Sequence, residues 1–440
     1  MKSLSRRLAI ASILAVPGLA QMRLVTLPGK SPMVDFRIVF EAGSAADPPP
    51  KPGTAWLTAM MLGQGGWNVQ VDKEMVTFSG SVPRDKLEEQ YQLLRAVLLD
   101  PGWREEDFER VKRNAINFLR VNLRSHNDEE LAKEVMEENI FQGTPYGHNS
   151  AGTVSSLKAI TLDDLKQFYR SNYCQQNLIL GIAGGYTPEL LERMKQDFRR
   201  LPEGRGFRTR EEPPALIRRN RAVIVEKNTQ SVAISIGFPT LVTRANPDYP
   251  ALLLVSSYLG PHQFEPDPNR ARRFQIFQIR IKPVEPDNVA FALHRALYEL
   301  SKLYTEGISR EDFERTRNLL NKYLHTRSKT SELGYAIDNI YYLVPNFDKY
   351  LKDGLATLTR NEVNRVIKRY LRTDRLVIVA VANHAEELKR ALTSGEGSPI
   401  AYNSQKPAEI LEEDKIAEKY PLGLRPEDVT IVPVEQVFEK

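Results

Sequence analysis

The chain has 440 residues, more than one ordinary hydrophobic core includes, so we expect two or more domains. Hydrophobic residues make up 41% and charged residues 27%, which is usual for a soluble globular protein. The 61 basic and 56 acidic residues leave a formal charge of only +5, which excludes the strongly basic balance typical of nucleic-acid binding.

The first twenty residues have the pattern of a secretory signal peptide. Lys2, Arg6 and Arg7 precede the uncharged stretch 8–16, and small residues up to Ala20 follow. We therefore expect an exported protein, periplasmic or extracellular, with cleavage after Ala20. The alternative is an uncleaved amphipathic anchor. No transmembrane segment is expected, because this stretch and all later apolar runs are too short.

The remaining chain shows the same order of elements twice. Strands with alternating apolar residues, at 34–40 and 232–236, come before amphipathic helices that include 87–94 and 289–303. The next helix carries Glu-Asp-Phe-Glu-Arg in both halves, starting at Glu106 and Glu311. Two copies indicate a duplicated domain and not a solenoid.

A later helix in each half also repeats. Thr161 and Thr359 are predicted N-caps, three residues before Asp164 and Glu362. Each helix runs into an apolar strand. Cys174, the only cysteine, follows the first helix; it excludes an intramolecular disulfide and is interpreted as structural.

These patterns predict an α+β fold: two homologous α/β sandwich domains, with mixed or antiparallel sheets and helices on one face. The predicted boundaries are 1–20 for the signal peptide, 21–205 for the first domain, 206–220 for a linker and 221–440 for the second domain. The residues from Ser394 onward are expected to wrap the second domain.

Residues 41–55 lead through a Gly-Ser turn and a Gly-Thr-Ala step into an apolar helix. This resembles the pitrilysin/insulinase family of inverzincin metallopeptidases, in which a similar turn opens the helix that bears His-x-x-Glu-His. The segments 144–148 (Thr-Pro-Tyr-Gly-His) and 152–153 (Gly-Thr) add to the resemblance. It covers nearly the whole mature chain and implies two peptidase-like domains.

In that family two histidines of one helix bind zinc, and the glutamate beside the second takes a proton from zinc-bound water. Carried over, the first histidine falls on Trp56, the glutamate on Ala59 and the second histidine on Met60. Tryptophan and alanine do not bind zinc, and a thioether is a poor zinc ligand. A further glutamate is implied on the helix after Pro101-Gly102, yet residues 110–127 contain no carboxylate.

We therefore predict a degenerate zinc motif at Trp56, Ala59 and Met60, with no catalytic residue, no metal site and no cofactor in this chain. Zinc is expected only in a partner subunit. The six histidines show no zinc-peptidase spacing. A metal site assembled from scattered histidines by folding is the alternative.

Two regions are shorter than the family pattern. After Gly66 a helix is missing before the strand, which 69–79 is expected to supply. After Gly260 the chain lacks the family's Arg-Glu-x-x-Gly-Leu-x-Tyr stretch, whose arginine and tyrosine help to hold the substrate.

The resemblance implies a non-catalytic, zinc-free subunit of an exported heteromeric peptidase, which contributes chamber wall and subunit contacts. Its partner would be an active zinc-bearing relative, and extended peptides are candidate ligands. The alternative is a stand-alone peptide- or protein-binding scaffold of the same fold. An active metallopeptidase and an enzyme with unrecognised chemistry are the remaining hypotheses.

Overall fold

The computed structural model describes residues 22–63, 66–204, 206, 213–259, 274–325 and 330–440. The signal peptide expected at 1–20 lies outside this part. Within it, no helix combines the length and the apolar character needed to cross a bilayer.

The first half is built on a five-stranded mixed sheet. Its strand order is β1-β5-β2-β4-β3, in which β1 and β5 are parallel and the other neighbours antiparallel. The strands are β1 Arg23–Pro28, β2 Met33–Phe40, β3 Asn68–Val71, β4 Val76–Pro83 and β5 Leu178–Gly184. The helices are α1 Thr54–Leu62, α2 Leu87–Leu99, α3 Glu105–Asn117, α4 Asp128–Ile140, α5 Val154–Ala159, α6 Leu162–Asn172 and α7 Pro188–Phe198.

The second half contains another five-stranded mixed sheet, ordered β10-β6-β9-β7-β8. Its strands are β6 Arg221–Glu226, β7 Val232–Thr240, β8 Gln275–Val284, β9 Val377–Ala382 and β10 Val429–Pro433. Its helices are α8 Tyr249–Leu259, α9 Val289–Glu306, α10 Arg310–His325, α11 Thr330–Tyr341, α12 Phe347–Thr357, α13 Arg360–Tyr370, α14 Ala385–Thr393 and α15 Ala408–Ala417. The α+β prediction with two such sheets is confirmed.

The duplication extends to the order of strands within the sheets. Four strands of the first sheet, β1-β5-β2-β4, have the same order as β6-β9-β7-β8 in the second. The capping predictions are also confirmed: Thr161 accepts from the Asp164 backbone and Thr359 from the Glu362 backbone, each within a capping box. Cys174 is buried and free.

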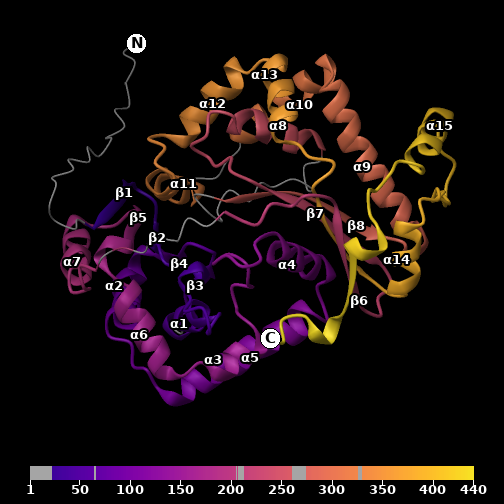
Figure 1. Ribbon diagram of the computed structural model, residues 1–440. Coiled ribbons are helices and arrows are strands. Elements are labelled where there is room, and N and C mark those ends of the chain that lie inside the picture. The colour runs from indigo at the N-terminus through magenta and orange to yellow at the C-terminus, as the bar shows by residue number, and fades with distance from the viewer. Residues whose placement is uncertain (1–21, 64–65, 205, 207–212, 260–273, 326–329) are drawn as a thin grey trace, which may run out of the picture.

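A helix from the other half covers the second face of each sheet (Figure 1). Helix α4 of the first half packs on β7 and β9, where Met136 shares an apolar core with Val379. Helix α11 of the second half packs on β1, β5 and β2, where Ile337 shares an apolar core with Ile179. The prediction had placed helices on one face only; these second faces are also apolar and require cover.

Glycine makes room at both crossings. A Cβ on Gly237 of β7 would lie 2.8 Å from the sulfur of Met136. A Cβ on Gly181 of β5 would lie 2.6 Å from Cδ1 of Ile337. The two helices approach their sheets closely because neither strand carries a side chain at that point.

The strand expected over 69–79 is two strands, β3 and β4, joined at Asp72–Met75. The backbone nitrogen of Asp72 donates to the Met75 carbonyl at 2.9 Å and closes this turn. A single strand was wrong because the buried polar residues Lys73 and Glu74 are used at the turn and not within a strand.

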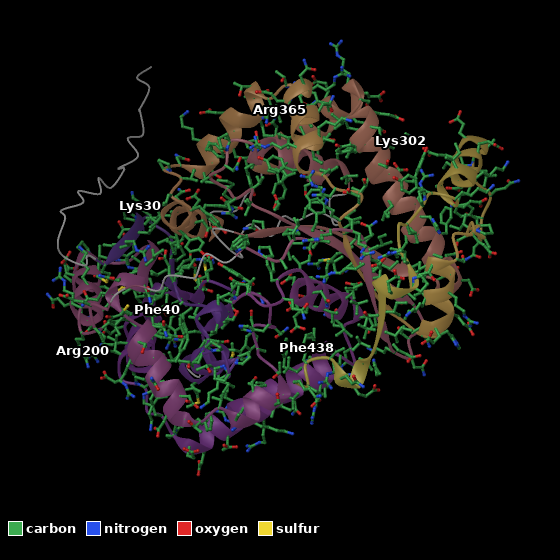
Figure 2. The ribbon with its side chains drawn as sticks, in the orientation of Figure 1. Lys30, Phe40, Arg200, Lys302, Arg365 and Phe438 are labelled. Atoms are coloured by element: carbon green, nitrogen blue, oxygen red, sulfur yellow. The ribbon has the colours of Figure 1, made fainter. Side chains whose placement is uncertain are left out.

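The C-terminal region does more than wrap the second half. Strand β10 pairs with β6 in parallel, and the residues after it reach the first half. There the backbone nitrogens of Val154 and Ser155 donate to the carbonyls of Phe438 and Glu439, at 2.8 and 3.0 Å. Arg124 holds the Glu439 carboxylate at 2.7 Å. Figure 2 shows Phe438 beside the helices of the first half.

Candidate functional site

Helix α1 is where the zinc motif was expected, and Asp47 fixes its start. The Asp47 carboxylate accepts hydrogen bonds from the backbone nitrogens of Gly53 and Ala55, at 2.7 and 2.6 Å. Gly53 has a φ of +94°, which residues with a side chain rarely adopt. Beyond this cap the helix is apolar on all sides, so it is enclosed by the protein.

The three motif positions lie in apolar surroundings. Ala59 is fully buried in the core of the first half, and Trp56 and Met60 are half-buried between that core and the cluster that joins the two halves. The Trp56 indole stacks on Phe118, with ring centroids 5.5 Å apart and planes at 24°. Among these side chains only the Met60 thioether has a lone pair suited to a metal, and it is a weak ligand for zinc.

Phe118 contacts a motif position, yet it could not be identified as a site residue from the sequence. It opens the π-helical turn η4 (Phe118–Leu123), which continues α3. This is the segment after Pro101-Gly102 where the family pattern implies a further zinc-binding glutamate. The lack of a carboxylate in this segment was visible in the sequence, but the Trp56–Phe118 contact depends on how α1 and α3 pack.

The side chains present do not fit a zinc ion. In the part of the chain that the structure describes, no three His, Cys, Asp or Glu side chains gather in a way that could hold a metal. An aromatic stack instead joins α1 to the helix that follows α3. Such a stack stabilises by burial and ring contact, and offers no group that could activate water.

A small cavity of about 170 Å³ lies beside the Trp56–Phe118 stack. Helix α4 also lines this cavity, with the carboxylates Glu130, Glu134 and Glu137. Lys133, whose side chain is buried, contacts Glu130 and lies 3.3 Å from Glu134. This ammonium group offsets the negative charge, as buried carboxylates require.

The loops whose residues resemble the family pattern lie against each other near the start of α1. Ser44 and Ser150 lie within hydrogen-bonding distance, with their hydroxyl oxygens 3.2 Å apart. The Ser156 hydroxyl donates to the Pro52 carbonyl at 2.7 Å. A Cβ on Gly152 would lie 2.2 Å from that same carbonyl oxygen, so the backbones touch there. These residues position the helix whether or not it binds metal.

Titratable groups are buried in this scaffold. Burial raises the pKa of Asp47 to about 8, against the opposing backbone hydrogen bonds, and raises the pKa of Glu138 to about 7. Burial, with the nearby Lys73 ammonium, lowers the pKa of His148 to about 4. The His148 Nε2 lies 4.0 Å from Asp47, and because the imidazole is neutral at pH 7 this contact is not an ion pair.

The sequence is similar to one family model and to several known proteins. Residues 159–320 match the family model described as Peptidase M16 inactive domain. The "Non-peptidase homolog YmxG" of Helicobacter pylori is 20% identical over 402 residues, which cover 81% of this chain and 90% of that protein. The "Probable inactive metalloprotease YmfF" of Bacillus subtilis is 21% identical, over 48% of this chain and 53% of that protein.

A third curated relative is a probable mitochondrial-processing peptidase subunit beta of Arabidopsis thaliana. It is 21% identical over 44% of this chain. The matched region spans only 37% of that protein.

Solved structures share the fold. The peptidase M16 inactive domain from Pseudomonas fluorescens has a TM-score of 0.72 at 20% identity, covering 83% of this chain and 96% of its own. The first half of the periplasmic protease PqqL from Escherichia coli has a TM-score of 0.66 at 14% identity, covering 91% and 96%. A chain of complex III2 from Candida albicans has a TM-score of 0.67 at 14% identity, covering 82% and 93%.

Proposed function

Since this chain is a homologue of the M16 peptidase family, with a Trp56–Phe118 stack where the zinc motif would lie, we propose that it is a non-catalytic subunit of an exported, two-chain M16 peptidase. The chain is an inactive homologue, like the relatives named non-peptidase and inactive metalloprotease. The active chain would supply the zinc and the general base.

Three likenesses support a subunit role. One curated relative is named as a subunit of a processing peptidase, and one similar fold was solved within complex III2. The likeness to the first half of PqqL also fits a partner that supplies a second such half.

The way the halves interlock supports a role as chamber wall. Because α4 and α11 each belong to a core of the other half, moving the halves apart would expose both apolar faces. A rigid wall of this kind would hold a partner's active site and an extended peptide in fixed positions without providing chemistry.

The test is co-purification of this chain with its most similar relative that keeps His-x-x-Glu-His. A stable pair with one zinc, and with peptide cleavage that neither chain shows alone, would establish the subunit role. As a control, replacing the partner's motif glutamate by glutamine should abolish cleavage and leave the pair intact. A monomer that never binds this relative would refute the proposal.

The second candidate is a stand-alone binding scaffold. The sequence observation that favours it is the lack of the Arg-Glu-x-x-Gly-Leu-x-Tyr stretch, because a subunit that contacts peptide would benefit from that arginine and tyrosine. Residues 260–273, where the shortening falls, lie outside the described residues. Peptide binding by the purified chain alone, measured by fluorescence polarisation, would favour this role over the first.

Export is part of the proposal and rests on the pattern of residues 1–20. The measurement is N-terminal sequencing of the protein recovered from a periplasmic fraction. A mature N-terminus at Gln21 would support cleavage after Ala20. An intact N-terminus in the cytoplasmic fraction would contradict export.

A further inference from the structure

A cavity of about 790 Å³ lies in the second half, away from the motif positions of α1. It is lined by the outer strand β8, by α9, by the end of α8 and by residues of the extended segment 400–406. The apolar walls include Ile279, Ile281, Phe291 and Ala296. The volume falls within the usual range of small-molecule sites, about 300–1,000 Å³.

The duplicated first half shows what the same place contains there. Phe36 of β2 pairs with Gly80 of β4, and the Trp67 ring covers Gly80 so closely that a Cβ there would lie 2.6 Å from it. Trp67 also packs edge-on against Phe36, with centroids 5.8 Å apart. The first half therefore fills this place with an indole.

The sheet registers identify the equivalent position in the second half. Phe36 pairs with Ile182 of β5, and Ile234 pairs with Ala380 of β9 at the repeated position. Ile234 in turn pairs with Ile281 of β8, so Ile281 takes the place of Gly80. Ile281 lines the cavity, which among the described residues therefore lies at the position that corresponds to the Trp67 ring.

The charges around the cavity are balanced. Two carboxylates, Glu285 and Glu299, and two cations, Arg295 and Lys406, line it. Arg295 is engaged by Glu299 at 2.5 Å and by Glu413 at 2.7 Å. Glu285 accepts a hydrogen bond from Asn403 at 3.1 Å. A charged ligand would have to break these pairs, so the lining favours an uncharged one.

Polar contacts outside the cavity hold the segment 400–406 in place. The Tyr402 hydroxyl donates to Asp414 at 2.6 Å, and Asp414 lies 3.2 Å from Arg295. Lys302 binds Glu413 at 2.6 Å, and in Figure 2 it lies on α9 toward α15. These contacts fix the segment beside the cavity without placing apolar side chains from α15 inside it.

We propose that this cavity binds a neutral hydrophobic small molecule, with an aromatic or branched hydrocarbon body that takes the place Trp67 fills in the first half. The site is independent of the proposed peptidase partnership, because it lies on the outer edge of the second sheet and uses none of the α1 residues.

The test uses N-phenyl-1-naphthylamine, a neutral aromatic probe that fluoresces in apolar sites. The purified full-length protein is titrated alongside Ala296→Leu, which adds carbon atoms from α9 into the cavity. Ser301→Leu places the same leucine side chain on α9 at a residue that does not line the cavity. We expect one saturable site, at least a tenfold weaker dissociation constant in Ala296→Leu, and no change in Ser301→Leu.

Thermal unfolding of the same proteins shows whether a variant binds the probe more weakly only because it is less stable. Ala296→Leu should keep or raise the midpoint, because it fills space and does not crowd a packed core. Failure of the unmodified protein to bind the probe, or equal binding by both variants, would overturn the proposal. Binding that arises only after residues 260–273 are removed would also overturn it, since the chain itself would then be the occupant.

Discussion

Tyr341, at the end of α11 in the second half, donates a hydrogen bond to Glu74, which lies between β3 and β4 in the first half. Tyr146 donates to the other oxygen of the same carboxylate at 2.5 Å. All three side chains are buried. The two halves are therefore joined by a polar contact inside the protein as well as by the exchange of α4 and α11.

Replacing Tyr341 by phenylalanine should lower the free energy of unfolding by about 1–3 kcal/mol, because a buried carboxylate oxygen loses a donor. Urea unfolding followed by circular dichroism measures this. The control is Tyr323→Phe, at a side chain that is 62% exposed, where a change within about 0.5 kcal/mol is expected. Equal losses in both variants would show that the contact between the halves contributes nothing specific.

Alanine at the two crossing glycines should destabilise to different extents. At Gly181 the new Cβ would lie 2.7 Å from the Arg37 carbonyl oxygen, which is backbone and cannot yield easily. At Gly237 the nearest atom is the flexible Met136 side chain. We expect Gly237→Ala to cost about 1–3 kcal/mol and Gly181→Ala to cost more.

Met136→Ala provides a double-mutant cycle for Gly237→Ala. If the sulfur is the obstacle, the double variant should lose less stability than the sum of the two single variants. Additive losses would place the strain elsewhere, for example at Ile276, whose Cγ2 would lie 3.1 Å from the new Cβ.

Restoring the motif on α1 alone should not restore a zinc site. The variant Trp56→His, Ala59→Glu, Met60→His gains the three motif residues but keeps Phe118 where a further ligand is needed. Metal analysis after zinc loading should find little bound zinc. Adding Phe118→Glu should raise the zinc content toward one per chain, because the fourth substitution faces α1. Stoichiometric zinc in the three-residue variant would show that Phe118 is not the missing position.

Stability should depend on the protonation of His148. Its folded pKa of about 4 lies below the usual histidine pKa of 6.5, so its contribution is present above pH 6.5 and is lost as the pH falls toward 4. Asp47 and Glu138, with raised pKa values, act in the opposite sense and lose their contribution as the pH rises toward 7–8. Comparing the unmodified protein with a His148 variant therefore separates the effect of His148 on stability from the effects of Asp47 and Glu138.

Unfolding of His148→Asn and of the unmodified protein should be compared from pH 4 to pH 7. We expect the stability difference to change by about 3 kcal/mol across this range, with the unmodified protein losing more toward low pH. His384→Asn is the control, because His384 is exposed and its φ of +50° also suits asparagine. Parallel curves for His148→Asn and the unmodified protein would contradict a buried neutral imidazole.

The parts of the fold that could be predicted from sequence depend on residues that lie close together along the chain. Thr161 and Thr359 were identified as caps because a capping box involves only residues three apart. The repeated strands were recognisable for the same reason. The pairing of Trp56 with Phe118, and the placing of α4 and α11 on the other half's sheet, depend on contacts far apart in sequence. One sequence contains no pattern of residue spacing that predicts such contacts.

Because α4 covers strands that are synthesised long after it, the order of synthesis conflicts with the order of assembly. A growing chain displays the apolar side of α4 and one bare face of the first sheet until β7, β9 and α11 have emerged. The contact of Phe438 and Glu439 with α5 can form only after β10 has been synthesised. The nascent protein is thus a natural client for a holding chaperone, and fragments that stop before β10 should aggregate.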